Sequence, residues 1–205
     1  LLVVADGLGG HASGERAAEI AVDALSGFDA NSTALDRELT ELVRHANRNI
    51  LQAAAEDLSH HGMGTTLTAA FISNGTAHWV HVGDSRLYLF RDQVVVQVTE
   101  DQTPVGLLLR TGELSPEEAR VHPARHMLMS CLGRCELEVE CGALDLQRGD
   151  LILLSTDGLH DLMSEELIAD ILGSKRNLDD RMDDLVAAAL AAGGRDNVTV
   201  AAAVI

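Results

Sequence analysis

Aromatic side chains are scarce in this chain, where Phe, Tyr and Trp together make up 2% of 205 residues. Leu, Val, Ile and Ala must therefore fill the core. A hydrophobic content of 46% is typical of a globular protein and excludes an intrinsically disordered chain. No apolar run reaches the about 18 residues that a membrane-spanning helix needs, and no secretory signal segment is present. We therefore expect one globular domain in the cytoplasm, without a membrane association.

Basic residues are also few. Lys and Arg number 15 and Asp and Glu number 32, which gives a net charge of −17. This imbalance excludes nucleic-acid binding through a basic face. It would also repel an anionic phosphate substrate unless cations occupy the binding site, so it is a first indication of bound metal. The alternative is that the charge only keeps the protein in solution.

Cysteine occurs three times, as Cys131, Cys135 and Cys141. The odd number and the spacing do not match paired zinc knuckles, and a structural zinc ion takes four ligands. We expect buried free thiols in a reducing compartment.

Two apolar runs end in the same three residues, Asp-Gly-Leu, one at Asp6 and the other at Asp157. A short run of Leu, Val and Ile bounded by Gly predicts a buried β-strand, and the Gly that follows lets the backbone turn sharply. Asp6 and Asp157 would share one site if their strands lie side by side, and paired carboxylates bind hard divalent cations. The alternative is two ordinary turns, since Asp-Gly is a common turn pair.

Three more acids stand at strand ends or corners. Asp196 precedes the last apolar run, Asp84 lies between two strand-like runs, and Asp161 follows Asp157 by four residues, so that a helical turn would point both to one side. Clustered acids repel one another without a cation, and oxygen-only ligands favour Mg²⁺ or Mn²⁺ over zinc. For each acid alone, a capping or turn role remains the alternative.

Hydrophobic periodicity places helices early, strands in the middle and helices late, which predicts an α+β fold with sheet packed on sheet and helices outside. Ser13 is expected to cap the first helix, and Asn74-Gly75 predicts a hairpin turn. The strands follow one another as a meander, so the sheets are expected to be mainly antiparallel. The expected helices cover 35–58, 116–121, 164–172 and 178–192, and the expected strands cover 65–72, 77–82, 86–90, 94–99, 126–131, 137–141, 151–155 and 197–205.

The stretch 100–125 differs from the rest of the chain. It is polar, contains Pro104, Pro116 and Pro123, and has no long apolar stripe. These features predict a mobile flap over a site.

Five sequence motifs fall in one order along almost the whole chain. They are Val4-Ala5-Asp6-Gly7-Leu8-Gly9-Gly10-His11, Gly64-Thr65-Thr66, Val82-Gly83-Asp84-Ser85-Arg86, Leu153-Leu154-Ser155-Thr156-Asp157-Gly158-Leu159-His160-Asp161 and Gly194-Arg195-Asp196-Asn197-Val198-Thr199. In these motifs the sequence resembles the metal-dependent protein serine/threonine phosphatases, the protein phosphatase 2C family, and in particular its bacterial branch.

The resemblance implies a four-layer α-β-β-α sandwich of two mainly antiparallel sheets flanked by helices, with a two-metal centre at one end. By that likeness Asp6 would bridge two Mn²⁺ or Mg²⁺ ions, and the Gly7 carbonyl would bind the first ion. Asp157 and Asp196 would bind the second ion.

A weaker third metal site of the family would match Asp84, Asp161 and Asp157. The variable flap of the family would lie near the substrate, and its substrate-contacting part is predicted at Thr111, Gly112 and Glu113.

The resemblance also implies the reaction. Two cations about 3.5–4 Å apart lower the pKa of a bridging water and hold the phosphoryl oxygens, so that this water hydrolyses phosphoserine and phosphothreonine in proteins. The substrates would be targets of a serine/threonine kinase, and the enzyme would be a monomer.

The chain starts inside a strand and without an initial Met. The family has an upstream motif, with an Arg that grips the phosphate and an acid that reaches the second metal, and we expect this motif before Leu1. We therefore expect one phosphatase domain over 1–205 that lacks its N-terminal strand. The alternative is a catalytically impaired pseudophosphatase that only binds phosphoproteins or other partners.

No general acid is assigned from the sequence. Many eukaryotic members carry a His directly after the bridging Asp-Gly, whereas this chain has Leu8, as is usual for the bacterial branch. His11 is a candidate in a Gly-rich loop, where the alternative is a hydrogen bond within the loop.

Overall fold

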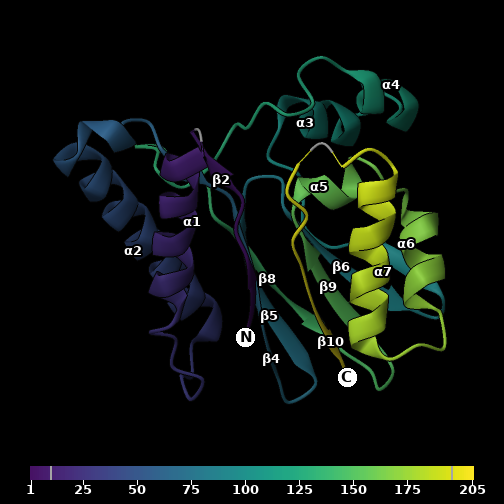
Figure 1. Cartoon of the computed structure of the whole chain (residues 1–205). Coiled ribbons are helices and arrows are strands. Elements are labelled where there is room, and N and C mark those ends of the chain that lie inside the picture. The colour runs from purple at the N-terminus through teal and green to yellow at the C-terminus, as the bar shows by residue number, and fades with distance from the viewer. Residues whose placement is uncertain (10, 195) are drawn as a thin grey trace.

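Two four-stranded antiparallel sheets stack face to face, and helices cover both outer faces (Figure 1). The computed structural model describes residues 1–9, 11–194 and 196–205, and of His11 it describes the backbone only. The first sheet has the order β1 (Leu2–Val4), β4 (Leu67–Ser73), β5 (Thr76–Val82) and β8 (Glu140–Asp145). The second has the order β10 (Val200–Val204), β9 (Leu151–Ser155), β6 (Arg86–Arg91) and β7 (Val94–Gln97). A small ribbon pairs β2 (Gly7–Leu8) with β3 (Gly64–Thr65).

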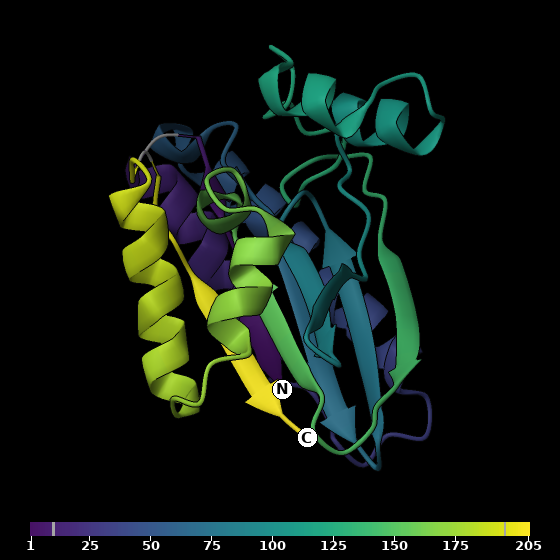
Figure 2. The same cartoon turned by 90° about the vertical axis from the view of Figure 1, so that its right-hand side faces the viewer.

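The helices form the outer layers. The first sheet is covered by α1 (His11–Leu25) and α2 (Leu35–Glu56), which the short 3₁₀ helix η1 (Leu58–His60) follows. The second sheet is covered by α6 (Glu165–Leu172) and α7 (Leu178–Ala191), and the single turn α5 (Asp157–His160) comes directly after β9. Two short helices, α3 (Pro104–Arg110) and α4 (Pro116–Val121), project beyond one end of the sandwich (Figure 2). The four-layer α-β-β-α architecture is thereby confirmed.

Both faces of each sheet are buried, so that successive side chains of one strand pack in two different cores. On β4, Leu67 and Ala69 pack against the helices α1 and α2, whereas Ala70 packs between the sheets. On β9, Leu153 packs on the side of α6 and α7, and Leu154 packs between the sheets. Successive side chains of a strand point to opposite faces, so strands that are buried on both faces consist of aliphatic residues almost throughout.

Two tight turns fix the register of the hairpins. Asn74 and Gly75, with φ of 52° and 79°, join β4 to β5. This is the predicted Asn-Gly hairpin, since a two-residue type I′ turn needs positive φ at both positions. Asp92 and Gln93, with φ of 52° and 64°, join β6 to β7 in the same way.

The first helix begins at His11, two residues before the predicted cap. Ser13 therefore lies inside α1 and does not cap it. Its hydroxyl instead donates a hydrogen bond of 3.1 Å to the Ser59 carbonyl, which ties α1 to η1.

The stretch predicted as a flap contains one helix more than expected. Thr103 caps the start of α3 with its side chain, which accepts a 2.9 Å hydrogen bond from Gly106 N, and Pro104 occupies the first turn. A Thr cap followed by Pro is a regular helix start, but a helix of this length has too few turns for its periodicity to stand out in the sequence.

The strand predicted at 126–131 is wrong. The segment forms turns and irregular chain, and Leu132, just beyond it, makes one isolated bridge to Thr65. The backbone of Met129 instead donates to the Gln102 carbonyl at 2.8 Å, because this segment carries the chain back from α4 to the sheets.

No helix within the described ranges is both long enough and apolar enough to cross a membrane. Of the three cysteines, Cys131 is buried as expected, whereas Cys135 and Cys141 are exposed. The expectation of buried thiols is therefore wrong for these two residues, because Cys135 lies in a loop and Cys141 lies on β8, the last strand of its sheet.

An ion pair with two hydrogen bonds ties β6 to the turn before β9. Arg91 Nε donates to Asp150 Oδ1 at 2.8 Å, and Arg91 Nη2 donates to Asp150 Oδ2 at 2.6 Å. The Asp150 side chain is 3% exposed and that of Arg91 is 30% exposed, so the carboxylate is the buried partner of this pair.

We expect Asp150→Ala to lower the free energy of unfolding, because it removes the carboxylate that accepts hydrogen bonds from Arg91 and from Gln147 N. Urea unfolding followed by circular dichroism measures the change. Asp145→Ala, at an exposed position of β8, is the control and should change the free energy by less than about 0.5 kcal/mol. Equal effects of the two substitutions would show that the ion pair does not stabilise the fold.

Candidate metal centre

Five aspartates converge on one cavity at the end of the sandwich. The cavity has a volume of about 330 Å³, and its wall contains all five acids that the sequence places at strand ends: Asp6, Asp84, Asp157, Asp161 and Asp196. Asp6 follows β1, Asp84 lies between β5 and β6, and Asp157 begins α5 at the end of β9. The strands that deliver these acids belong to both sheets, so the cavity spans the end of the sandwich.

The backbone of Asp6 is held by two threonines at the end of β3. Its N–H donates to Thr66 Oγ1 at 3.0 Å, and its carbonyl accepts from Thr66 N and from Thr65 Oγ1, both at 2.9 Å. Thr66 Oγ1 also shares a hydrogen bond of 2.7 Å with Ser85 Oγ, next to Asp84. The two threonines therefore fix Asp6 and link it to the corner that carries Asp84.

Gly7 lies in close contact with the first turns of α1. A Cβ at Gly7 would come within 2.2 Å of the Gly14 carbonyl oxygen, and a Cβ at Gly14 would come within 2.7 Å of the Gly7 carbonyl group. Only glycine fits at either position. The approach of the helix thus determines where the Gly7 carbonyl, the predicted ligand of the first metal ion, lies.

Asp157 and Asp196 meet because β9 and β10 are antiparallel neighbours, so that β9 ends where β10 begins. Two threonines join the chain beyond this ladder. Thr156 N donates to the Thr199 carbonyl at 3.1 Å, and Thr199 N donates to Thr156 Oγ1 at 3.1 Å. The separation of the two acids is therefore set by backbone pairing.

Asp84 lies in a tight corner between β5 and β6. Gly83 has a φ of 108°, and a Cβ there would lie 2.7 Å from the Thr66 methyl group. The nearby Arg86 offsets the charge of Asp84 only in small part, because its guanidinium donates hydrogen bonds of 2.8 and 2.6 Å to Asp101. Asp84, which is 9% exposed, has no basic ion-pair partner within the described ranges.

The acids disfavour one another's charge when no cation lies between them. Burial, and then the charges of Asp157 and Asp196, raise the pKa of Asp6 to about 7. Burial, and then the charges of Asp157 and other nearby acids, raise the pKa of Asp84 to about 8. Burial also raises the pKa of Asp157, to which the charges of Asp161 and Asp196 contribute.

The donor set fits a hard divalent cation. Asp157 Oδ1 is buried and has no hydrogen-bond partner among the described residues, although buried polar side-chain atoms usually have one. The neighbouring acids add carboxylate oxygens, which Mg²⁺ and Mn²⁺ prefer as ligands. A cation would give Asp157 Oδ1 a partner and offset the repulsion among the acids.

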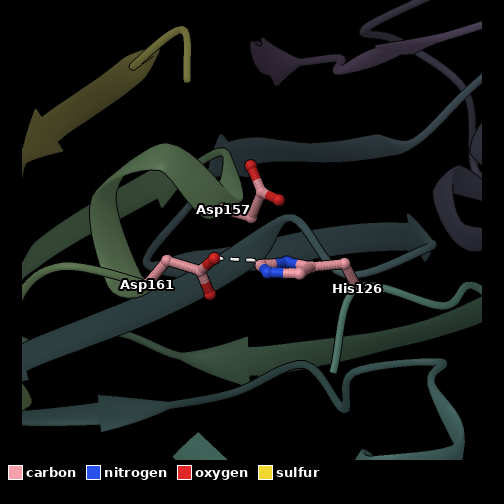
Figure 3. Close-up of side chains that lie close together, drawn as sticks. All are labelled: His126, Asp157 and Asp161. Atoms are coloured by element: carbon pink, nitrogen blue, oxygen red, sulfur yellow. Dashed lines mark ion pairs between the residues drawn. The ribbon is translucent and has the colours of Figure 1, made fainter. Parts of the chain in front are cut away.

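His126 belongs to the same wall, although the sequence assigns it no role. Its Nδ1 lies 3.2 Å from Asp161 Oδ2. One ligand atom each of His126, Asp157 and Asp161 lie within 4.8 Å of one another (Figure 3). The sequence around His126 contains no motif that relates it to the aspartates at the strand ends. Its position at the cavity becomes visible only in the structure, where the chain returns from α4.

The predicted substrate-contacting residues lie outside the cavity wall. Thr111, Gly112 and Glu113 follow α3 in the exposed connection to α4, where Thr111 Oγ1 donates to Glu113 Oε1 at 2.9 Å. They do not line the cavity. Their contact with a substrate stays a prediction.

The role of His11 as a general acid also stays untested, because its side chain lies outside the described residues, as do Gly10 and Arg195 of the motifs. Leu8 lines the cavity and carries no titratable group. His160, which lies between Asp157 and Asp161 in the sequence, is not part of the wall.

Comparison with known proteins points to one family. The sequence profile described as Protein phosphatase 2C matches residues 1–196. The serine/threonine phosphatase stp of Listeria monocytogenes serovar 1/2a is 39% identical over 207 residues, which cover 98% of this chain and 82% of that protein. The crystal structure of the Mycobacterium tuberculosis serine/threonine phosphatase PstP/Ppp has a TM-score of 0.93 at 38% identity and covers 99% of this chain and 87% of that chain.

A further solved structure contains metal. The catalytic domain of the serine/threonine protein phosphatase PstP, in complex with two manganese ions, is 37% identical to this chain and has a TM-score of 0.90. The match covers 100% of this chain and 87% of that chain.

We expect Gly14→Ala to weaken Mn²⁺ binding by about 10-fold or more and to lower the melting temperature, because the added Cβ pushes α1 away from Gly7. The expected fall in melting temperature is the opposite of the usual effect, since replacing Gly by Ala inside a helix normally stabilises the helix. Calorimetric titration with Mn²⁺ and thermal unfolding measure the two changes. Gly27→Ala is the control, since the nearest atom to its Cβ would lie 3.7 Å away. A Gly14→Ala protein that matches the control in both measurements would contradict the account.

We expect the metal-free protein to lose stability as the pH rises from about 4 to about 8. Asp6 and Asp84 have folded pKa values of about 7 and about 8, above the about 3.9 of an unfolded Asp. In this window the folded state holds protons that unfolding releases, so a higher pH favours unfolding. Melting temperatures in EDTA at several pH values measure the effect.

The control for this pH series is Asp84→Asn, which lacks one of the raised pKa values and should show a smaller loss of stability. Added Mn²⁺ should raise the melting temperature more at about pH 8 than at about pH 5, because ions then replace the lost protons. If the wild type and Asp84→Asn respond to pH identically in EDTA, the acids do not repel one another as described.

Proposed function

The chain belongs to the protein phosphatase 2C family and is a metal-dependent protein serine/threonine phosphatase, and we propose that the cavity of five aspartates is its metal centre. Asp6 would be a ligand of both Mn²⁺ or Mg²⁺ ions, and the Gly7 carbonyl would be a ligand of the first. Asp157 and Asp196 would hold the second.

The observation that carries this assignment is the buried oxygen Asp157 Oδ1, which has no partner among the described residues. It belongs to the acid whose charge contributes to the raised pKa values of both Asp6 and Asp84. A buried carboxylate in this state is costly, and a divalent cation bound to it supplies the compensating interaction.

The protein's own part in the reaction is to hold the ligands in place. When bound, two such ions lower the pKa of a water and neutralise the charge that develops on the phosphoryl group. Threonine hydrogen bonds fix Asp6, the approach of α1 fixes Gly7, and the ladder of β9 and β10 fixes Asp157 against Asp196. Because backbone contacts set these positions, little reorganisation is needed for catalysis.

The apolar part of the wall serves the same end. Leu8, Leu128 and Leu162 line the cavity beside the acids. Apolar groups keep water away and lower the local dielectric constant, which strengthens the attraction between the ions and a phosphoryl group.

A third ion is proposed at Asp84 and Asp161, next to Asp157.

The proposed substrate is a phosphorylated serine or threonine of a protein that a serine/threonine kinase modifies. Residues 1–205 form a single catalytic domain in this proposal. In this proposal the domain acts as a monomer.

We expect the wild type to release phosphate from a phosphothreonine peptide only with Mn²⁺ or Mg²⁺, and Asp157→Asn to reduce kcat about 100-fold or more. Groups hydrogen-bonded to metal ligands already contribute about 10- to 100-fold, and Asp157 is proposed as a ligand itself. Phosphate release with Mn²⁺, with EDTA and after restoring Mn²⁺ is the measurement.

Asp145→Asn, which removes an exposed carboxylate far along β8 from the cavity wall, is the matched control and should keep full activity. An Asp157→Asn protein as active as this control would refute the metal assignment. A wild type without any metal-dependent activity would favour the pseudophosphatase alternative.

A further inference from the structure

Two basic side chains share the cavity wall with the five aspartates. Arg125 and His126 come from the chain that returns from α4, and both line the cavity. His126 is paired with Asp161, whereas Arg125 makes no ion pair within the described residues. In the described part of the wall, its guanidinium is therefore a permanently charged donor that is free to bind a ligand.

Two other arginines near this end of the molecule are already engaged. Arg86 donates two hydrogen bonds to Asp101, and Arg110 on α3 lies 3.0 Å from Glu100. Neither of these arginines lines the cavity. Arg120 on α4 also makes no ion pair within the described residues, but it is exposed and does not line the cavity, so Arg125 is the unpaired arginine of the described cavity wall.

The backbone that carries Arg125 is braced. His122 Nδ1 accepts a hydrogen bond of 3.1 Å from Ala124 N, and the His122 carbonyl accepts one of 3.2 Å from Arg125 N. Met127 N donates to the Ala124 carbonyl at 3.1 Å. Pro123 adds a fixed φ to this turn. Together with the ion pair of His126, these bonds hold the turn against the cavity.

A guanidinium at this place matches a phosphoryl group. Its planar fork donates two parallel hydrogen bonds to phosphate oxygens, and such bonds are stronger than neutral ones. The charge of the wall favours the same ligand. With only the two main ions bound and the proposed third site empty, four positive charges face the five aspartates of the wall, so a cationic side chain favours the binding of a phosphate dianion.

We propose that Arg125 binds the phosphoryl group of the substrate and that the contact of His126 Nδ1 with Asp161 Oδ2 positions Arg125. This proposal rests on the phosphatase function proposed above. Arg125 is then a substrate-binding residue, and His126 is a positioning residue that acts through it.

The test compares Arg125→Ala and Arg125→Lys with the wild type, all loaded with Mn²⁺. KM and kcat for a phosphothreonine peptide and the inhibition constant of inorganic phosphate are measured. Arg125→Ala should raise KM and the inhibition constant about 10- to 100-fold, the range of a hydrogen bond to a charged group. The KM and the inhibition constant of Arg125→Lys should fall between those of the wild type and Arg125→Ala, because the lysine ammonium keeps the positive charge but cannot donate two parallel hydrogen bonds.

The control variant is Arg120→Ala, which removes an exposed arginine of α4 that does not line the cavity. It should leave KM and the inhibition constant within about 2-fold of the wild type. If Arg125→Ala behaves like this control, the proposal is wrong. Calorimetric titration of each variant with Mn²⁺ is the second readout. Loss of Mn²⁺ affinity in Arg125→Ala would also overturn the proposal, since Arg125 would then support the metal centre.

The role of His126 is tested by a double-mutant cycle. If His126 acts through Arg125, then His126→Ala raises the inhibition constant of phosphate in the wild type and has no further effect in Arg125→Ala. If the fold-changes of the two single variants multiply in the double variant, His126 does not act through Arg125, and the positioning role is wrong.

Failure of the proposed function is distinguishable from failure of this inference. A wild type that hydrolyses no phosphopeptide with Mn²⁺ refutes the phosphatase function. Calorimetric titration of inorganic phosphate into the Mn²⁺-loaded wild type and Arg125→Ala still decides whether Arg125 binds phosphate. Equal affinities of the two proteins would refute the inference.

Discussion

Mutual repulsion among five aspartates in one cavity is the constraint around which the rest of the molecule is arranged. Burial makes it stronger, because it removes the water that would screen the charges. Burial itself is the largest cause of the raised pKa values of Asp6 and Asp84, and the charges of the neighbouring acids add to it. A chain free to move would separate such groups. The fold prevents this, and the same repulsion makes the cavity attractive to divalent cations.

The fold holds the acids through the backbone and not through other charges. Stacked aliphatic sheets form a stiff body, and the acids stand where the strands end. Thr66 bonds to the backbone of Asp6 and to Ser85 beside Asp84, so one hydroxyl serves two corners of the site. Arg86, which could neutralise the cluster, is bound to Asp101. The negative charge is thereby left for metal.

Much of this site could be predicted from the sequence because its acids are tied to features that the sequence displays. Asp6 and Asp157 end apolar runs, and the antiparallel order of the meander brings such ends together. His126 could not be predicted, since it lies in a turn whose position depends on contacts made far away in the chain. The prediction of a strand at 126–131 is wrong for the same reason: the residues have local β propensity, but contacts elsewhere in the chain fix the segment as an irregular connection from α4 back to the sheets.

Anomalous scattering from crystals of this chain grown with Mn²⁺ tests the central claim most directly. The account predicts anomalous peaks inside the cavity, at coordination distance from oxygens of Asp6, Asp157 and Asp196 and from the Gly7 carbonyl. An empty cavity at saturating Mn²⁺, or peaks only at other acids of the surface, would contradict it.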